Sequence, residues 1–176
     1  MGGVHVNAED MALNLDLQLV EETSLQILFR LIVGNDAADK VLIPYPQIIG
    51  LEFTDAKGIH AEWYTRLLVS ARWSGVGLEP LERKPILFRV GPTAVPCPKD
   101  NDHSDYYRWS VDLGPGRYAV KYVLAVNDDY FDGDSHYRLE DVRKAATNMS
   151  ANVWTGKAES NVVNFEFKLP GPNTAH

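Results

Sequence analysis

The stretch LGPGRYAVKYVLAV, residues 113–126, decides how the rest of the chain is interpreted. Gly114-Pro115-Gly116 is a turn signal, because proline fixes φ and glycine accepts φ values that other residues avoid. The run from Tyr118 to Val126 is apolar apart from Lys121, which is typical of a strand buried inside a sandwich. Val153-Trp154-Thr155-Gly156 and residues 160–167 repeat this pattern near the end of the chain. We therefore expect a tight turn that leads into the central strand of an antiparallel sandwich.

Alternating apolar and polar residues predict further strands along the whole chain. Leu25 to Val33 is apolar on both faces, which favours a central strand, whereas Pro44 and Pro46 predict a bent edge strand at 40–43. The glycines of Ser74-Gly75-Val76-Gly77 predict a flexible connection. Helical spacing within 137–147 predicts one short amphipathic helix in the longest loop. The sequence thus predicts an all-β, immunoglobulin-like antiparallel sandwich with one short helix, its other strands being at 13–19, 48–53, 59–64, 85–90, 106–113 and 162–169.

Length and composition limit the function classes. The chain has 176 residues and 45% hydrophobic content, which predicts a single domain over 1–176 with frayed termini at 1–12 and 170–176. No window offers the roughly 18 apolar residues of a membrane helix. The net charge of −7 argues against nucleic acid and favours a basic protein surface or a cation. The start of the chain lacks a signal pattern, so we expect a cytoplasmic protein, or a periplasmic or secreted one if a leader has been removed.

Leu113-x-Pro115-x-x-Tyr118 resembles the tyrosine corner of immunoglobulin-like and fibronectin type III-like sandwiches. In those domains the tyrosine hydroxyl bonds back to backbone that the crossing between sheets leaves unpaired. Trp154-x-Gly156 followed by Ser160-Asn161 is similar to the closing strand of bacterial domains of that class. The resemblance implies a fold and says little about function.

Residues 25–64 carry a second, weaker resemblance. Asn35, Val41-Leu42-Ile43-Pro44 and then Asp55-x-x-Gly58 before Trp63 are similar to the intracellular proteinase inhibitor family of bacilli. That resemblance implies binding rather than catalysis, with loops plugging a protease cleft. The chain is longer than such a domain needs, and the segments at 91–105 and 127–150 have no counterpart in it.

Those two segments are strongly acidic, and a count of strand directions predicts that both lie at one end of the sandwich together with 21–24 and 55–58. Crowded carboxylates repel one another, and a hard cation such as Ca²⁺ would relieve the repulsion. An EF-hand is excluded, because Tyr130 would occupy its third position and Leu139 its twelfth. A calcium site of another kind stays open, formed by Asp128, Asp129, Asp132 and Asp134.

The predicted function is that of a non-enzymatic protein-binding module, an inhibitor or immunity-type partner of an enzyme, with no required cofactor. Acidic loops would be steered to a basic surface, and aromatic side chains between the charges would anchor them. The alternative is a calcium-dependent sandwich that binds carbohydrate or is structural. The oligomeric state stays open. The predicted partner-binding residues are Trp73, Asp100, Asp102, Asp105, Tyr106, Asp128, Asp129, Tyr130, Phe131, Asp132 and Asp134.

Overall fold

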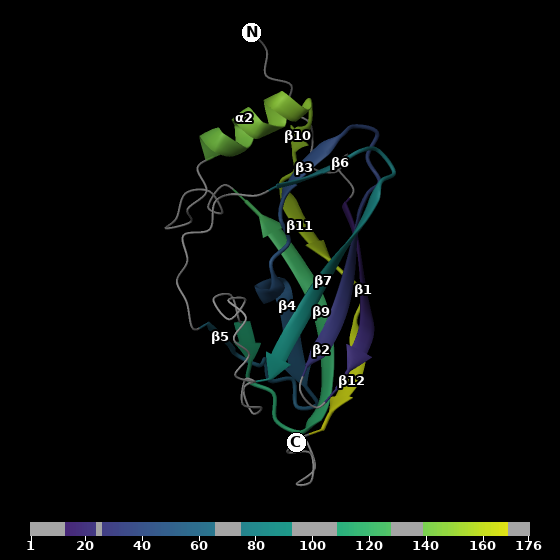
Figure 1. Cartoon of the computed structure of the whole chain (residues 1–176), viewed down its shortest axis with the longest axis vertical. Coiled ribbons are helices and arrows are strands. Elements are labelled where there is room, and N and C mark those ends of the chain that lie inside the picture. The colour runs from purple at the N-terminus through teal and green to yellow at the C-terminus, as the bar shows by residue number, and fades with distance from the viewer. Residues whose placement is uncertain (1–12, 24–25, 66–74, 93–108, 128–138, 169–176) are drawn as a thin grey trace, which may run out of the picture.

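The computed structural model describes residues 13–23, 26–65, 75–92, 109–127 and 139–168 (Figure 1). Within these residues the chain forms strands and one α-helix, which confirms the predicted all-β fold with one short helix. The strands are β1 (Leu13–Glu22), β2 (Ile27–Asn35), β3 (Val41–Pro44), β4 (Leu51–Asp55), β5 (Trp63–Thr65), β6 (Gly75–Leu78), β7 (Arg83–Pro92), β8 (Trp109–Val111), β9 (Gly116–Val126), β10 (Asn152–Val153), β11 (Gly156–Glu159) and β12 (Val163–Phe167), and the helices are the 3-10 turn η2 (Ile48–Gly50) and α2 (Leu139–Met149).

The first sheet has the strand order β1-β2-β7-β8-β5. Its three long strands are antiparallel, and β2 is central, as its two apolar faces predict. The short strand β8 joins the sheet parallel to the last two residues of β7. Asn161 covers the outer edge of β1, because its side-chain amide accepts from the Leu17 N–H at 2.7 Å and donates to the Leu17 carbonyl at 3.0 Å.

The second sheet is built around β9, the strand that the opening stretch predicts. β4 pairs with one edge of β9, while β12 and β11 pair with successive parts of the other edge. Between these two strands Ser160 stays bonded to Tyr122 of β9, whose N–H donates to the Ser160 hydroxyl at 2.8 Å. β9 therefore has paired neighbours on both edges, and its alternate residues Val120, Tyr122, Leu124 and Val126 are buried because they face the core.

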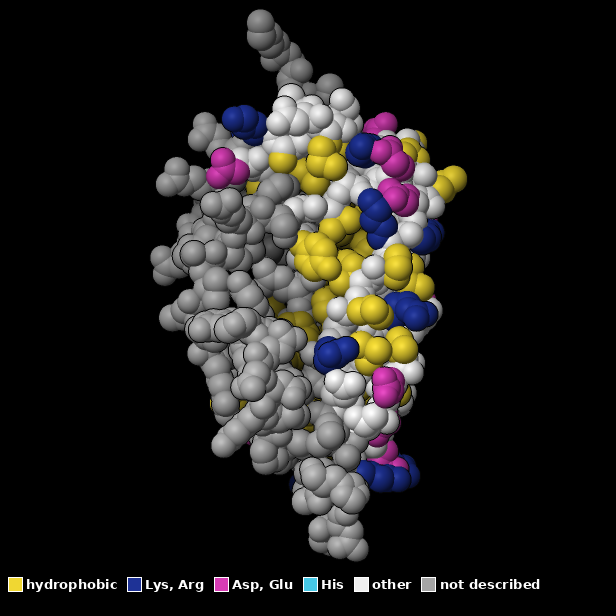
Figure 2. All heavy atoms as spheres, in the orientation of Figure 1, with side chains coloured by type: hydrophobic (Ala, Val, Ile, Leu, Met, Phe, Trp, Pro, Cys, Tyr) yellow, Lys and Arg dark blue, Asp and Glu magenta, His cyan; other side chains and the backbone are white. Residues whose placement is uncertain are grey.

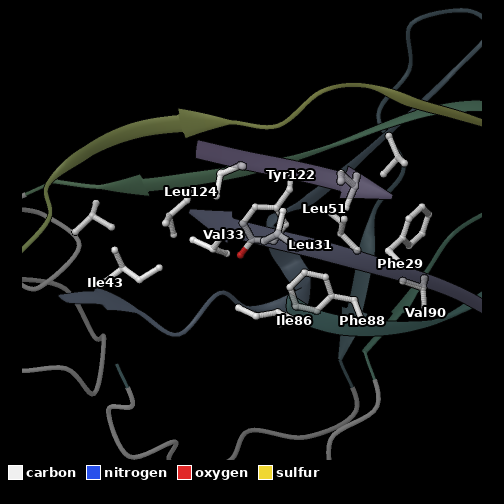
Figure 3. Packing of buried hydrophobic residues seen from close by; sticks show 14 of the residues in the cluster. Phe29, Leu31, Val33, Ile43, Leu51, Ile86, Phe88, Val90, Tyr122 and Leu124 are labelled. Carbon is white, nitrogen blue, oxygen red and sulfur yellow. The ribbon is translucent and has the colours of Figure 1, made fainter. Parts of the chain in front are cut away.

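Aromatic rings from the two sheets meet in the core (Figure 3). Phe88 of β7 stacks on Tyr122 of β9 with ring centroids 5.4 Å apart, and Phe29 of β2 meets Phe53 and Phe165 edge-on. Large side chains buried to this degree each contribute about 1.5–3 kcal/mol through loss of apolar surface from water. The two sheets therefore form the predicted sandwich with a single core between them.

A third, smaller sheet closes one end of the sandwich in the order β10-β3-β6, with α2 beside it (Figure 1). Val142 and Ala146 are the buried residues of the helix. The helix ends in a Schellman motif: Ser150 has φ 50°, its N–H bonds the Thr147 carbonyl, and the next N–H bonds the Ala146 carbonyl at 2.9 Å.

Two strand predictions are wrong, and they change the geometry of the chain. β3 is not an edge strand, because it lies between β10 and β6. Residues 75–77 of the predicted flexible connection at 74–77 belong to strand β6. In addition, β8 is only three residues long and runs parallel to the end of β7, so the chain does not cross the sandwich between β7 and β9. Consequently Pro92 at the end of β7 and Val126 at the end of β9 lie at opposite ends of the sandwich, and the prediction that the connections after them start at one end is wrong (Figure 1).

The hydrogen bond implied by the tyrosine-corner pattern is present. The Tyr118 hydroxyl donates to the Gly114 carbonyl at 2.9 Å, and the Tyr118 ring stacks on Phe165. Burial raises the pKa of this phenol, although the bond to Gly114 opposes that shift. Membership of the immunoglobulin-like class stays a prediction.

Candidate functional site

The site residues predicted from the sequence all lie outside the described residues. This holds for Trp73, for the carboxylates and Tyr106 of residues 100–106, and for the acidic and aromatic residues of 128–134. Their predicted roles in binding a partner or calcium therefore stay predictions. The described residues contain a different candidate, on the outer face of the first sheet.

Strand β7 alternates strictly between the core and the outside. Ile86, Phe88 and Val90 are buried, while the residues between them are exposed. Leu87 keeps 60% of its surface exposed although it lies in the middle of a long paired strand. The outward row is Arg83, Pro85, Leu87 and Arg89.

Strand β2 continues this surface with the outward side chains Leu28, Arg30 and Ile32. Arg30 is the register partner of Leu87, and Leu28 is the register partner of Arg89, so arginine and leucine alternate in both directions across the two strands. Together with the β7 row, these side chains form what we call the arginine-leucine face. Figure 2 shows hydrophobic side chains interspersed with Lys and Arg over this side of the molecule.

One end of the face is hollowed. Arg30, Ile32, Arg83, Pro85 and Leu87 line a shallow depression of ≈ 450 Å³. The Arg83 side chain crosses directly over Gly34, where a Cβ would collide with the guanidinium, and it pairs with Asp36. Glycine at position 34 therefore lets Arg83 lie flat against the sheet as one wall of the depression.

The buried Asn35 fixes the chain beside this wall. Its side-chain amide donates to the carbonyls of Asp39 at 2.8 Å, Leu78 at 3.1 Å and Glu79 at 3.2 Å, and its oxygen accepts from the Ala37 N–H at 2.9 Å. One polar side chain thus holds the turn after β2 against the β6–β7 connection, with its hydrogen-bonding groups satisfied.

The same connection holds Leu81 in an unfavourable position. Leu81 has φ 62°, a left-handed conformation that costs a leucine about 1–2 kcal/mol, and its side chain is 76% exposed. Its N–H bonds the Asn35 carbonyl at 2.8 Å, which keeps the turn in place. Neither burial nor backbone preference favours leucine at position 81. Leu81 is thus a strained and exposed apolar residue, and it lies two positions before Arg83.

The outer face of the second sheet is different, because its charges are paired. Lys121 on β9 lies 3.0 Å from Glu159 and 3.6 Å from Glu52, and Lys157 lies 2.6 Å from Glu159. Hydrogen bonds from Lys157 and Lys121 hold the pKa of Glu159 below its usual range, and the bond to Glu159 raises the pKa of Lys121. Paired charges of this kind are typical of a solvated surface, although a shallow depression of ≈ 520 Å³ lies at one end of this sheet, lined in part by Arg117, Tyr118 and Phe165.

Other kinds of site find no support in the part of the chain that the structure describes. It contains no group of three or more His, Cys, Asp or Glu side chains that could hold a metal ion. Its histidine, His60, lies in an exposed turn with Nδ1 3.2 Å from the Thr54 hydroxyl. No helix among the described residues is long and apolar enough to cross a membrane.

The sequence does carry a signal for the arginine-leucine face. Leu28 and Ile32 on the second face of β2 indicate only that the strand is central, because a buried and an exposed apolar face look alike in sequence. The arginines between the leucines are the signal for an outward face, since an unpaired guanidinium is not placed in a core. The chain matches no protein family, and no curated protein or solved structure matches it.

Proposed function

We propose that this chain is a non-enzymatic protein-binding module that docks its partner on the arginine-leucine face. The observation that carries the proposal is the exposure of Leu87 on the paired strands β2 and β7, where it lies opposite Arg30 and two positions before Arg89. Arginine is enriched at protein interfaces, whereas lysine and glutamate are depleted there relative to the rest of the surface, and the exposed leucine adds apolar area that a partner would cover.

The contrast between the two outer faces supports this choice. On the second sheet Lys121 is neutralised by Glu52 and Glu159, and the apolar residues there are small. On the first sheet Arg30 and Arg89 form no ion pair with any described residue. Docking on the first face would bury leucine side chains and give the guanidinium groups partners, whereas docking on the second would break existing pairs.

The position of Leu81 supports the proposal further. A residue held at positive φ with its apolar side chain exposed lowers the stability of the free protein, so its presence is explained by a role outside the fold. Leu81 lies at the end of the face where the depression is, and it would anchor the edge of a bound partner.

The test is capture of a partner from the native source with three immobilised baits. The wild-type chain and Ala125→Asp, which places the same charge on the exposed outer face of β9, should retain the same protein. Leu87→Asp should lose it, because a carboxylate in the centre of the face is not compatible with burial against an apolar surface. A protein retained equally by all three baits would show that docking occurs elsewhere, and the acidic segments 99–105 and 128–136 would then be the next candidates.

If the captured partner is an enzyme, the chain could act as its inhibitor or immunity-type partner. Its activity, measured with and without a molar excess of the chain, decides that point. Wild type should suppress the activity and Leu87→Asp should not.

A further inference from the structure

We infer that the arginine-leucine face recognises a carboxylate of the partner, an Asp or Glu side chain flanked by aliphatic residues, which binds between Arg30 and Arg89. This inference rests on the proposed function and names the chemistry of the partner. It concerns four side chains of the face: the two arginines, Leu28 and Leu87.

The strand register places these four residues at the corners of a square. Leu28 lies opposite Arg89 and Arg30 lies opposite Leu87, so the two arginines are diagonal neighbours. Diagonal residues on adjacent antiparallel strands are about 7–8 Å apart, which is within reach of two long side chains that converge on one carboxylate. All four side chains point away from the core, because Ile27, Phe29, Phe88 and Val90 occupy the inward positions.

Neither arginine of the square forms an ion pair with a described residue, and Asp16 of β1, a diagonal neighbour of Arg30, accepts a hydrogen bond from Gln18 at 2.8 Å. Arg83, the third arginine of the face, is paired with Asp36, whereas Arg30 and Arg89 have no acidic partner among the residues that the structure describes. Two guanidinium groups this close repel each other, and a carboxylate placed between them removes the repulsion. Arginine binds carboxylates through two parallel hydrogen bonds, so one carboxylate can bond both groups.

The two leucines indicate what surrounds that carboxylate. A bound segment in extended conformation presents alternate side chains to the face at a rise of about 3.3 Å per residue. With its acidic residue between the arginines, its neighbours on the same side meet Leu28 and Leu87. We therefore expect the order aliphatic, acidic, aliphatic at alternate positions of the partner.

A nucleic-acid phosphate offers similar oxygen acceptors, but the chain carries a net charge of −7. Nucleic acid binding requires clustered positive charge to displace counterions from many phosphates, and two arginines in an acidic protein do not supply it. Leucine side chains also have no role against a phosphate backbone. The observations therefore favour a protein carboxylate.

Titration of isotope-labelled full-length chain with a defined probe tests the inference. The probe is the peptide Ser-Leu-Thr-Glu-Thr-Leu-Ser, with matched peptides that carry Gln or Lys in place of Glu and a short thymidine oligonucleotide as the phosphate arm. The methyl resonances of Leu28 and Leu87 report binding by NMR, which detects millimolar affinities. We expect the Glu peptide to shift both methyl signals and to bind about tenfold more tightly than the Gln peptide, as the loss of one charged hydrogen-bonding group predicts.

Reversal of the two charges is the matched control. Arg30→Glu combined with Arg89→Glu should exchange the preference, so that the Lys peptide binds more tightly than the Glu peptide, while the remaining methyl spectrum shows an intact fold. Equal affinity for the Glu and Gln peptides, no methyl shift with the Glu peptide, or tighter binding of the oligonucleotide would each overturn the inference.

Failure of this inference is distinct from failure of the proposed function. If Leu87→Asp abolishes capture of the natural partner while the double arginine reversal leaves its affinity unchanged, the face docks a protein but does not bind its carboxylate. If Leu87→Asp leaves capture unchanged, the proposed function itself is wrong.

Discussion

Replacement of Leu81 by glycine should stabilise the protein and at the same time weaken binding of its partner. Leu81 is held at φ 62° in the β6–β7 connection, with its side chain 76% exposed. Glycine adopts this conformation without steric cost. Few substitutions at a surface position are expected to raise stability and weaken binding at once. This variant therefore tests both the backbone strain at Leu81 and the role of its side chain in binding.

The magnitude follows from two opposing terms. Relief of the left-handed conformation should return about 1–2 kcal/mol, and the extra freedom of glycine in the unfolded chain should remove about 0.5–1 kcal/mol. A side chain as exposed as that of Leu81 loses little burial when it is removed. The two terms leave a net gain of about 0–1.5 kcal/mol in the free energy of unfolding, centred near about 0.75 kcal/mol, and a rise in Tm of up to about 6 °C for a chain of this length.

Denaturant unfolding and thermal unfolding measure the gain against two controls. Leu81→Ala removes the side chain but keeps the unfavourable backbone, so its stability should stay near that of wild type, within about 0.5 kcal/mol. Ser150→Gly relieves the other positive φ of a residue that is not glycine, at the end of α2, and should stabilise the chain without any effect on binding. Both Leu81 variants should bind the partner more weakly than Ser150→Gly does.

A loss of stability in Leu81→Gly would refute this reasoning. It would mean that the Leu81 side chain packs against another part of the protein, and the argument that leucine serves a partner at this position would lose its basis.

Three further predictions concern the fold and the alternative function. Asn35→Ala should lower the free energy of unfolding by about 1–3 kcal/mol, since it leaves the buried carbonyl of Leu78 and the partly buried carbonyls of Asp39 and Glu79 without their donor; no measurable loss in denaturant unfolding would contradict it. Glu159→Gln should lower the stability of the protein at neutral pH but not at acid pH. The folded pKa of Glu159 lies below its unfolded value, so the stabilisation by this carboxylate is present above about pH 4.3 and is lost as pH falls through the folded pKa. The difference in Tm between wild type and Glu159→Gln should therefore shrink from neutral pH to about pH 3, and a constant difference would argue against it. If the acidic segment with Asp128, Asp129, Asp132 and Asp134 binds calcium, Tm should rise with calcium concentration relative to chelator, and an unchanged Tm removes the calcium alternative.

The sequence predicts the centre of the fold well because its signals there are local. Gly114-Pro115-Gly116 and the apolar run after it specify the turn and β9 without reference to the rest of the chain. The helix is found two residues from its predicted position for the same reason, since its apolar spacing is a property of the segment itself.

The parts that sequence reasoning misses depend on tertiary contacts. Gly75–Leu78 has two glycines and reads as a connection, yet it forms β6 because β3 offers a free edge. Pro44, the last residue of β3, predicts that this strand lies at the edge of its sheet. Instead β3 pairs with β10 on one side and with β6 on the other. The ends of β7 and β9 are misplaced for another tertiary reason, the parallel pairing of the short strand β8 with the end of β7, which no local pattern predicts.

The candidate site is missed for a related reason. Leu28 and Ile32 show that the second face of β2 is apolar, and Arg30 between them is the only local sign that no other layer covers it. The exposure of Leu87 and the absence of acidic partners for Arg30 and Arg89 among the described residues become visible only when the strands are in register.

The most direct test of the account is the Kd of the captured partner for wild type, Leu87→Asp and Ala125→Asp, measured on the purified proteins. The account predicts that Leu87→Asp weakens binding at least tenfold, as expected for a residue worth about 1.4 kcal/mol or more at the centre of an interface, and that Ala125→Asp changes Kd less than about twofold. An unchanged Kd for a folded Leu87→Asp variant would contradict the claim that the arginine-leucine face is the binding surface.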